Sequence, residues 1–224
     1  MQNKSRFRRF ACALLAFSLA DAGHAASLLV NGSFEDPAVA PGTWAVFGTI
    51  PGWTTTFGPG IEIRNARVGT AQDGVNFVEL DSNPLPGNSG MAQTFTSPST
   101  MLDIAYWYAA RPGTPPTSNG IEIWLNALNI GGLFIPGDSG LGTTQTAWTR
   151  YSATVNGIVG ANTLEFRAVG RADKLGGSLD NVTVVAQPAP LAPTPVPVPL
   201  PAPFGLLGLG VAALLASRRQ ARAV

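Results

Sequence analysis

The sequence predicts an all-β protein built on one antiparallel β-sandwich of the jelly-roll kind. Three observations lead to this fold class. Short runs of alternating apolar and polar residues recur through the middle of the chain, clusters of Gly, Pro, Asn and Asp separate them, and no amphipathic helical pattern interrupts them. Long Gly-rich loops and the lack of a Cys-Trp-Cys pattern favour a jelly roll over an immunoglobulin-like topology.

The expected strands belong to one domain, residues 27–186. Alternation predicts strands at residues 61–64, 77–81, 91–96, 101–109, 121–126, 148–155, 163–169 and 178–185. Turn formers such as Pro51-Gly52 and Asn119-Gly120 lie between such runs. About 160 residues are enough for a full-sized hydrophobic core.

The first 25 residues have the three parts of a secretory signal peptide. Lys4 and three arginines precede the apolar residues 10–20, and small residues lead up to Ala25. We therefore expect an N-terminal signal helix over residues 1–25 and export of the protein.

The C-terminal part of the chain has the order of a sorting tail. A Pro-rich spacer at residues 187–203 leads into an uncharged apolar run at 204–217 and a basic end at 218–224. The run is short against the roughly 20 residues of a spanning helix, and a buried C-terminal helix is the alternative. A run apolar on all sides, followed by an arginine cluster, favours a transmembrane helix with a cytoplasmic basic tail.

A short motif at the end of the spacer carries a family resemblance. Val198-Pro199-Leu200-Pro201-Ala202, followed by a Gly/Leu-rich helix and an Arg cluster, resembles the bacterial PEP-CTERM sorting signals of the VPLPA type. Leu200 stands where the commonest form of the motif has Glu. The resemblance implies a transient inner-membrane anchor, cleavage by an exosortase as partner, and a final location at the cell surface or in the extracellular matrix.

Composition excludes several function classes once both ends are set aside. Removing four basic residues and Asp21 with the signal, and three arginines with the tail, leaves 7 basic and 12 acidic residues, so the domain carries −5 whereas the whole chain carries +1. An acidic domain offers no footprint for nucleic acid. Cys12 and His24 both fall in the signal peptide, which excludes Cys-His and Ser-His-Asp catalysis and the usual zinc sites. Oxygen-coordinated metals remain possible.

A second resemblance covers nearly the whole domain. The opening Leu29-Val30-Asn31-Gly32-Ser33-Phe34-Glu35-Asp36-Pro37, together with Ile50-Pro51-Gly52-Trp53, Val78-Glu79-Leu80-Asp81, Met91-Ala92-Gln93-Thr94-Phe95 and Leu179-Asp180-Asn181-Val182, is similar to galactose-binding-like jelly rolls. Nearest are the choice-of-anchor C type domains. The resemblance implies a carbohydrate-associated, non-catalytic module and does not identify a sugar. We expect its partner to be a polysaccharide or envelope glycan.

The same resemblance implies one structural Ca²⁺ between the first and last strands. Carried onto this chain, Glu35 and Asp180 would supply carboxylates, with backbone carbonyls near Gly32 and Ser33 completing the site. The alternative is that Asn31 and Asp180 satisfy turn backbones and that Glu35 is solvated.

Candidate ligand-binding residues are those with flat faces or planar hydrogen-bonding groups in or beside loops, because a pyranose offers an apolar C–H face and a ring of hydroxyls. They are Trp44, Trp53, Phe57, Tyr108 and Arg111. Packing is the alternative role for each aromatic. Tyr106, Trp124 and Trp148 fall within expected strands and are assigned to the core.

The sequence thus predicts an exported carbohydrate-binding surface protein without enzymatic activity. Two alternatives remain open. Glu79 and Asp81 share one face of a strand at a spacing suited to a secreted glycoside hydrolase, although alternating polar residues also mark any solvent-facing strand. The other alternative is a purely structural surface protein.

Overall fold

The computed structural model describes residues 26–130 and 140–188. These residues form twelve β-strands and one short 3-10 helix, η1 (Pro116–Ser118). The expected signal peptide, the transmembrane helix, the basic tail and all but two residues of the spacer lie outside the described residues. Among the described residues, no helix has the length and hydropathy needed to cross a bilayer.

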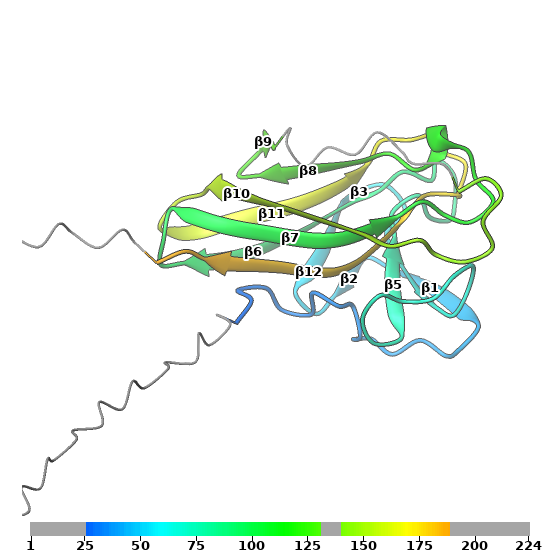
Figure 1. The fold of residues 1–224 in the computed structure, drawn as a ribbon, viewed down its shortest axis with the longest axis horizontal. Coiled ribbons are helices and arrows are strands. Elements are labelled where there is room, and N and C mark those ends of the chain that lie inside the picture. Colours follow the sequence, from blue (N-terminus) through cyan, green and yellow to red (C-terminus); the bar gives the residue numbers. More distant parts are fainter. Residues whose placement is uncertain (1–25, 131–139, 189–224) are drawn as a thin grey trace, which may run out of the picture. The chain divides into compact units, whose positions relative to one another are not determined.

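The strands form two six-stranded sheets in which every pair is antiparallel (Figure 1). Sheet A has the order β1 (Thr43–Phe47), β4 (Ile61–Asn65), β5 (Asn76–Glu79), β12 (Ser178–Ala186), β7 (Met101–Ala109) and β10 (Thr149–Asn156). Sheet B has the order β2 (Thr49–Ile50), β3 (Trp53–Phe57), β6 (Gly90–Ser97), β11 (Gly160–Ala168), β8 (Ile121–Leu125) and β9 (Leu128–Asn129). The predicted antiparallel β-sandwich is confirmed.

Each of the eight runs predicted from alternation coincides with a strand. The structure adds β1, β2, β3 and β9. Asp81, expected at the end of a strand, instead forms an isolated bridge with Asn88 beyond the end of β5.

Period-two alternation separates an inner from an outer face, as β7 shows. Leu102, Ile104 and Tyr106 belong to the hydrophobic core. Successive side chains of a strand point to opposite faces, so Asp103, Ala105 and Trp107 stand on the outer face of sheet A.

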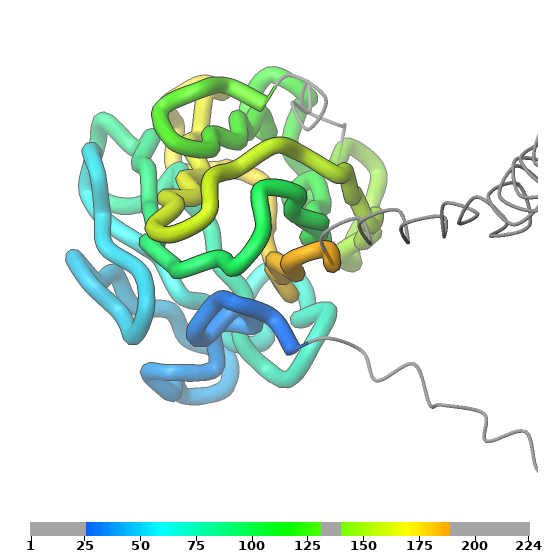
Figure 2. Tube along the Cα trace, turned by 90° about the vertical axis from the view of Figure 1, so that its left-hand side faces the viewer, coloured from blue at the N-terminus to red at the C-terminus, as the bar shows by residue number. Residues whose placement is uncertain are grey.

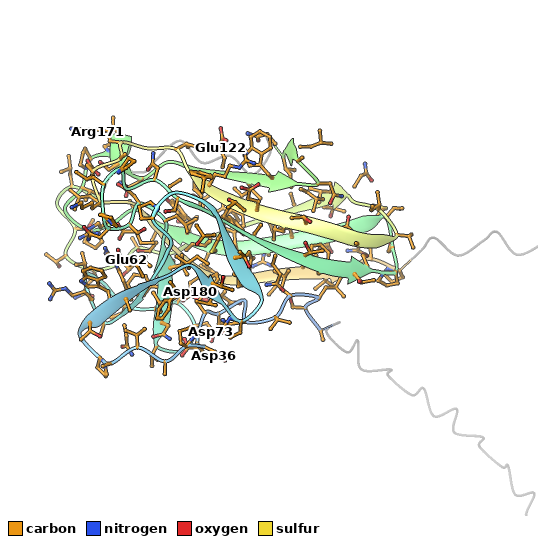
Figure 3. All side chains as sticks on the ribbon, turned by 180° about the vertical axis from the view of Figure 1, so that it is seen from behind. Asp36, Glu62, Asp73, Glu122, Arg171 and Asp180 are labelled. Atoms are coloured by element: carbon orange, nitrogen blue, oxygen red, sulfur yellow. The ribbon has the colours of Figure 1, made fainter. Side chains whose placement is uncertain are left out.

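The N-terminal segment 27–32 lies along β12, although it forms no named strand. Leu28 N–H donates to the Val184 carbonyl at 2.7 Å, and Val182 N–H donates to the Gly32 carbonyl at 2.9 Å. Figure 2 shows this blue segment beside the orange last strand. The contact requires Gly32, because a Cβ there would lie 2.1 Å from the Val182 carbonyl oxygen. Figure 3 labels Asp36, which follows this segment, on the same side of the domain as Asp73 and Asp180.

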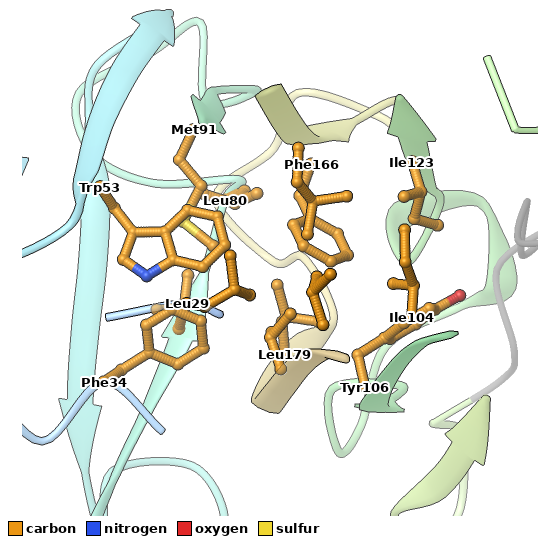
Figure 4. Close-up of a cluster of buried hydrophobic side chains, with 14 of the residues drawn as sticks. Leu29, Phe34, Trp53, Leu80, Met91, Ile104, Tyr106, Ile123, Phe166 and Leu179 are labelled. Atoms are coloured by element: carbon orange, nitrogen blue, oxygen red, sulfur yellow. The ribbon is translucent and has the colours of Figure 1, made fainter. Parts of the chain in front are cut away.

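Large aromatic side chains fill the centre of the sandwich (Figure 4). Trp53 packs between Phe34 and Phe166, with ring centroids 5.7 and 6.1 Å away, and Tyr106 meets Phe166 edge-on at 5.5 Å. All four side chains are completely buried. The core therefore joins Phe34, which follows the N-terminal segment, to β3, β11 and β7 in one packed unit.

Candidate functional site

The outer face of sheet A carries a groove of about 490 Å³ across β12, β7 and β10. Its shape follows from the register of the three strands. Ala105 has Thr183 as its partner on one side and Ser152 on the other, so three small side chains lie in one row. The lining residues are Asp103, Ile104, Ala105, Arg150, Ser152, Ala153, Thr154, Thr183 and Val185.

Larger side chains stand on both sides of this low row. On one side Asp103 pairs in register with Thr154 and Val185. Thr154 Oγ1 donates to Asp103 Oδ1 at 2.6 Å, and the Gln187 side-chain amide donates to Asp103 Oδ2. This side therefore presents a carboxylate held in place by two donors.

On the other side of the row stands Trp107, with Arg150 of β10 as its register partner. Trp107 is partly exposed, and Arg150 is exposed with one hydrogen bond to Ser152 Oγ at 3.3 Å. An indole, a guanidinium, hydroxyls and a carboxylate thus share one open face. Trp107 was not among the predicted ligand-binding residues, although the alternation that places Tyr106 in the core also places its neighbour outside.

The predicted ligand-binding residues are not brought together. Trp53 is completely buried in the core, and Tyr108 is 3% exposed with its hydroxyl donating to the Asn119 carbonyl at 2.5 Å. Neither offers a face to a glycan, which corrects their assignment as ligand contacts. Trp44 and Phe57 are 41% and 42% exposed but belong to different sheets. Arg111 forms an ion pair with the buried Glu79, as described below.

Two tryptophans expected in the core lie on outer faces instead. Trp148 precedes β10, meets Phe77 edge-on at 6.0 Å and donates to the Thr70 carbonyl. Trp124 of β8 lies under the Arg167 guanidinium, 4.1 Å from the ring centre. For Trp124, strand alternation places the side chain on the face opposite to Ile123 and Leu125, which belong to the core.

Arg111 belongs to a buried cluster on the outer face of sheet A. Glu62 and Glu79 are register partners on β4 and β5. Arg64 lies between them, with Nε 2.7 Å from Glu62 Oε1 and Nη1 2.6 Å from Glu79 Oε2. Arg111 Nη1 donates to both Glu79 oxygens at 2.8 and 3.0 Å. Burial raises the pKa of Glu79 to about 8, against the opposing effect of both arginines.

Glu79 and Asp81, the carboxylate pair considered for glycoside hydrolysis, are both buried and engaged. Glu79 also accepts from Gly176 N–H at 2.9 Å, and Asp81 Oδ2 accepts from the N–H groups of Asp173 and Leu175 at 3.0 Å each. Glycosidases place such carboxyl groups on either side of a scissile bond. This geometry assigns both residues to holding loops together.

The residues predicted to bind calcium are held by backbone N–H groups. Asp180 accepts three such bonds, from Gln72, Asp73 and Asn181, and Glu35 Oε1 accepts from Val75 and Asn76. Burial raises the pKa of Asp180 to about 7.

The other two predicted calcium residues are also satisfied. The Gly32 carbonyl accepts from Val182 N–H, and Ser33 Oγ donates to Asp73 Oδ2 at 2.7 Å. The backbone donors thus supply positive partial charge to the carboxylates of Glu35 and Asp180. Within residues 26–130 and 140–188 there is no cluster of three or more acidic, His or Cys side chains suited to a metal. Calcium binding at Glu35 and Asp180 stays a prediction.

No family model matches the chain, and no curated protein matches it. Solved structures do resemble it. A Stig cyclase, Fisc from Fischerella sp. TAU, solved with an indole compound, has a TM-score of 0.50 and 18% identity over 74% of this chain and 100% of its own. The family 35 carbohydrate-binding module of Paenibacillus barcinonensis has a TM-score of 0.41 and 21% identity over 65% and 100%. The arabinose-bound α-L-arabinofuranosidase MgGH51 has a TM-score of 0.49 and 14% identity, and the match covers 74% of this chain and 27% of its own. The likeness to the cyclase is one of fold alone.

Proposed function

We propose that the domain is a non-catalytic carbohydrate-binding module and that its glycan lies in the groove on sheet A. The observation that carries this proposal is the low row of Thr183, Ala105 and Ser152 beside Trp107. Sugars bind where an aromatic face meets the apolar side of the ring and planar polar groups meet the hydroxyls. The groove volume, about 490 Å³, is within the range of known ligand sites.

Charge and exposure support the same site. Arg150 and Asp103 lie at different ends of the lining, so the groove offers both donors and acceptors to hydroxyl groups. The groove is open across the sheet, which suits an internal stretch of a polymer. Binding of one such module is weak, and many copies at one surface strengthen attachment.

Replacing Trp107 by Ala is expected to weaken glycan binding about tenfold, because stacking of one sugar on an indole is worth about 1.4 kcal/mol. A polysaccharide microarray identifies the ligand, and isothermal titration measures its affinity. Trp124→Ala is the matched control, since Trp124 is also partly buried on an outer face, but on sheet B. Equal weakening by both substitutions, or none by Trp107→Ala, would place the glycan elsewhere. An array without any binding would favour a purely structural surface protein.

The proposed setting of this module is the cell surface or extracellular matrix. Its support is the sequence alone: the signal-like residues 1–25, the Val198-Pro199-Leu200-Pro201-Ala202 motif and the basic end. An exosortase is the proposed partner, and the inner membrane is the proposed transient anchor.

Removal of the tail is expected in the native host. Mature protein isolated from the cell surface should lack Arg218, Arg219 and Arg222, because cleavage near the proline motif separates them from the domain. Intact-mass spectrometry of the surface fraction measures this. Finding the three arginines in surface material would contradict sorting by cleavage, while leaving the groove proposal untouched.

A further inference from the structure

Three residues from separate segments lie close together beyond the end of β5: Asp81, Asn88 and Asp173. Asp81 forms its isolated bridge with Asn88, which precedes β6. Asp173, in the loop between β11 and β12, donates its N–H to Asp81 Oδ2 at 3.0 Å. Asn88 Nδ2 donates to the Gly170 carbonyl of the same loop at 2.8 Å. Strand pairing and loop contacts therefore bring two carboxyl groups and one amide into one small region.

Each of these side chains has one buried oxygen without a hydrogen-bond partner: Asp81 Oδ1, Asp173 Oδ1 and Asn88 Oδ1. Asp81 as a whole is only 1% exposed. An unsatisfied buried acceptor is destabilising, and one positive partner shared by the three oxygens would satisfy all of them.

The remaining atoms of the two carboxyl groups are fixed. Asp81 Oδ2 accepts from Asp173 N–H and Leu175 N–H, and Asp173 Oδ2 accepts from Ser118 Oγ at 2.9 Å. The free oxygens are thereby held in place. Burial raises the pKa of Asp81 most, and the side-chain hydrogen bond with the Asp173 carboxyl group and then its like charge raise it further.

The surrounding charges do not neutralise this pair. Arg171 Nε lies 3.8 Å from Asp173 Oδ2, and its side chain is 69% exposed, so its contribution is screened by water. At Glu35 and Asp180, by contrast, backbone N–H groups satisfy the carboxylates. The unpartnered acceptors thus belong to Asp81, Asp173 and Asn88, and not to Glu35 and Asp180, the pair that the sequence predicts to bind calcium.

We propose that Asp81, Asp173 and Asn88 form a divalent-cation site with a preference for Ca²⁺. All three offer hard oxygen donors, and Ca²⁺ takes six to eight oxygens in flexible geometry, with water and backbone carbonyls completing the shell. Mg²⁺ demands near-ideal octahedral ligands and sheds its water reluctantly. Asp173, 24% exposed along its side chain, gives the ion access from solvent. Binding ties the segment before β6 to the loop before β12, independently of any glycan.

Calcium titration of the exported protein, stripped with chelator, tests this site. Isothermal titration should show binding that Asp173→Asn weakens at least tenfold, because one of two charged ligands is lost. Glu122→Gln, which removes a carboxylate from β8 of the other sheet, is the matched control and should leave calcium binding within about twofold. Asp180→Asn separates this site from the one predicted at Glu35 and Asp180. Thermal melting in chelator checks that each variant folds. Asp173 is partly exposed and Asp81 is buried, so a substitution at Asp173 disturbs folding less than one at Asp81.

Two results would overturn the proposal. Calcium binding that survives Asp173→Asn but is lost in Asp180→Asn would assign the ion to the first and last segments of the domain. No calcium binding, with an unchanged melting temperature in calcium and in chelator, would mean that Asp81 and Asp173 share a proton instead. Asn88→Ala is a second test variant, because it removes a proposed ligand without changing any carboxylate. It is also expected to lower the calcium affinity at least severalfold.

Discussion

Replacing Arg64 by Ala is expected to lower the free energy of unfolding by about 3–5 kcal/mol, the usual cost of removing one partner from a buried ion pair. Arg64 lies between Glu62 and Glu79, which face each other across β4 and β5 and are 1% and 0% exposed. Like charges directly opposite in a sheet repel. Without the guanidinium both carboxylates remain buried, and Glu79 keeps Arg111 alone. Urea denaturation followed by circular dichroism measures the change.

The same loss should depend on pH. Burial raises the pKa of Glu79 to about 8 from an ordinary value of 4.5. The folded state therefore holds the proton of this carboxyl group more tightly than the unfolded state does. As the pH rises from about 4.5 to about 8, Glu79 increasingly disfavours folding. When Glu79 is protonated, Arg64 pairs with the charge of Glu62 alone, and less is lost when Arg64 is removed. The effect of Arg64→Ala is therefore expected to be larger at pH 9 than at pH 6.

Arg167→Ala is the matched control for Arg64→Ala. Arg167 also pairs with a glutamate two residues earlier on its own strand, with Nη2 2.7 Å from Glu165 Oε2, but its side chain is 31% exposed. Exposed pairs are worth about 0–1 kcal/mol. Equal losses from the two substitutions, or a loss below 1 kcal/mol from Arg64→Ala, would contradict the assignment of Arg64 as the cation that holds this cluster together.

The sandwich was predictable because one face of each long strand is apolar. In β7 and β8 the core positions alternate with outward-facing ones, such as Asp103, Ala105 and Glu122, and this pattern is visible in sequence. The strand β3 was not predicted, because Trp53 is its only buried residue and residues 54–57 do not alternate between apolar and polar. Strand order was not predictable, since it depends on pairings between distant segments.

The groove could be predicted only in part. Alternation alone places Trp107 on the outer face, but the hollow arises because Thr183, Ala105 and Ser152 are neighbours on three strands. That register joins residues far apart in the chain. The buried position of Glu62 and Arg64 has the same origin: alternation predicts a solvent face, and Arg111 and the Trp148–Phe77 contact show that distant segments pack on it.

Trp53 shows why loop-flanking aromatics were misassigned. It follows the Pro51-Gly52 turn, a position typical of ligand-binding loops. The side chain instead turns inward, and its Nε1 donates to the Asn31 carbonyl at 3.2 Å. The partner comes from the N-terminal segment, which no local pattern identifies.

Trp53→Ala is accordingly expected to cost about 3–5 kcal/mol of unfolding free energy, the range for large aromatic truncations in a core. The substitution removes a completely buried ring from between Phe34 and Phe166 and leaves the Asn31 carbonyl without its indole donor. Trp53→Phe should recover most of the loss, because it refills much of the cavity and restores the ring contacts. Urea denaturation of the three proteins measures both effects.

Trp44→Ala is the control that separates packing from binding. Trp44 is 41% exposed on β1, so its removal should change the unfolding free energy by no more than about 1 kcal/mol, as for other surface positions. If Trp53 were a ligand contact, its replacement would weaken glycan binding with little loss of stability. A large loss of stability in Trp53→Ala, with glycan affinity preserved in the folded Trp53→Phe protein, assigns this tryptophan to the core that positions β3 and the N-terminal segment.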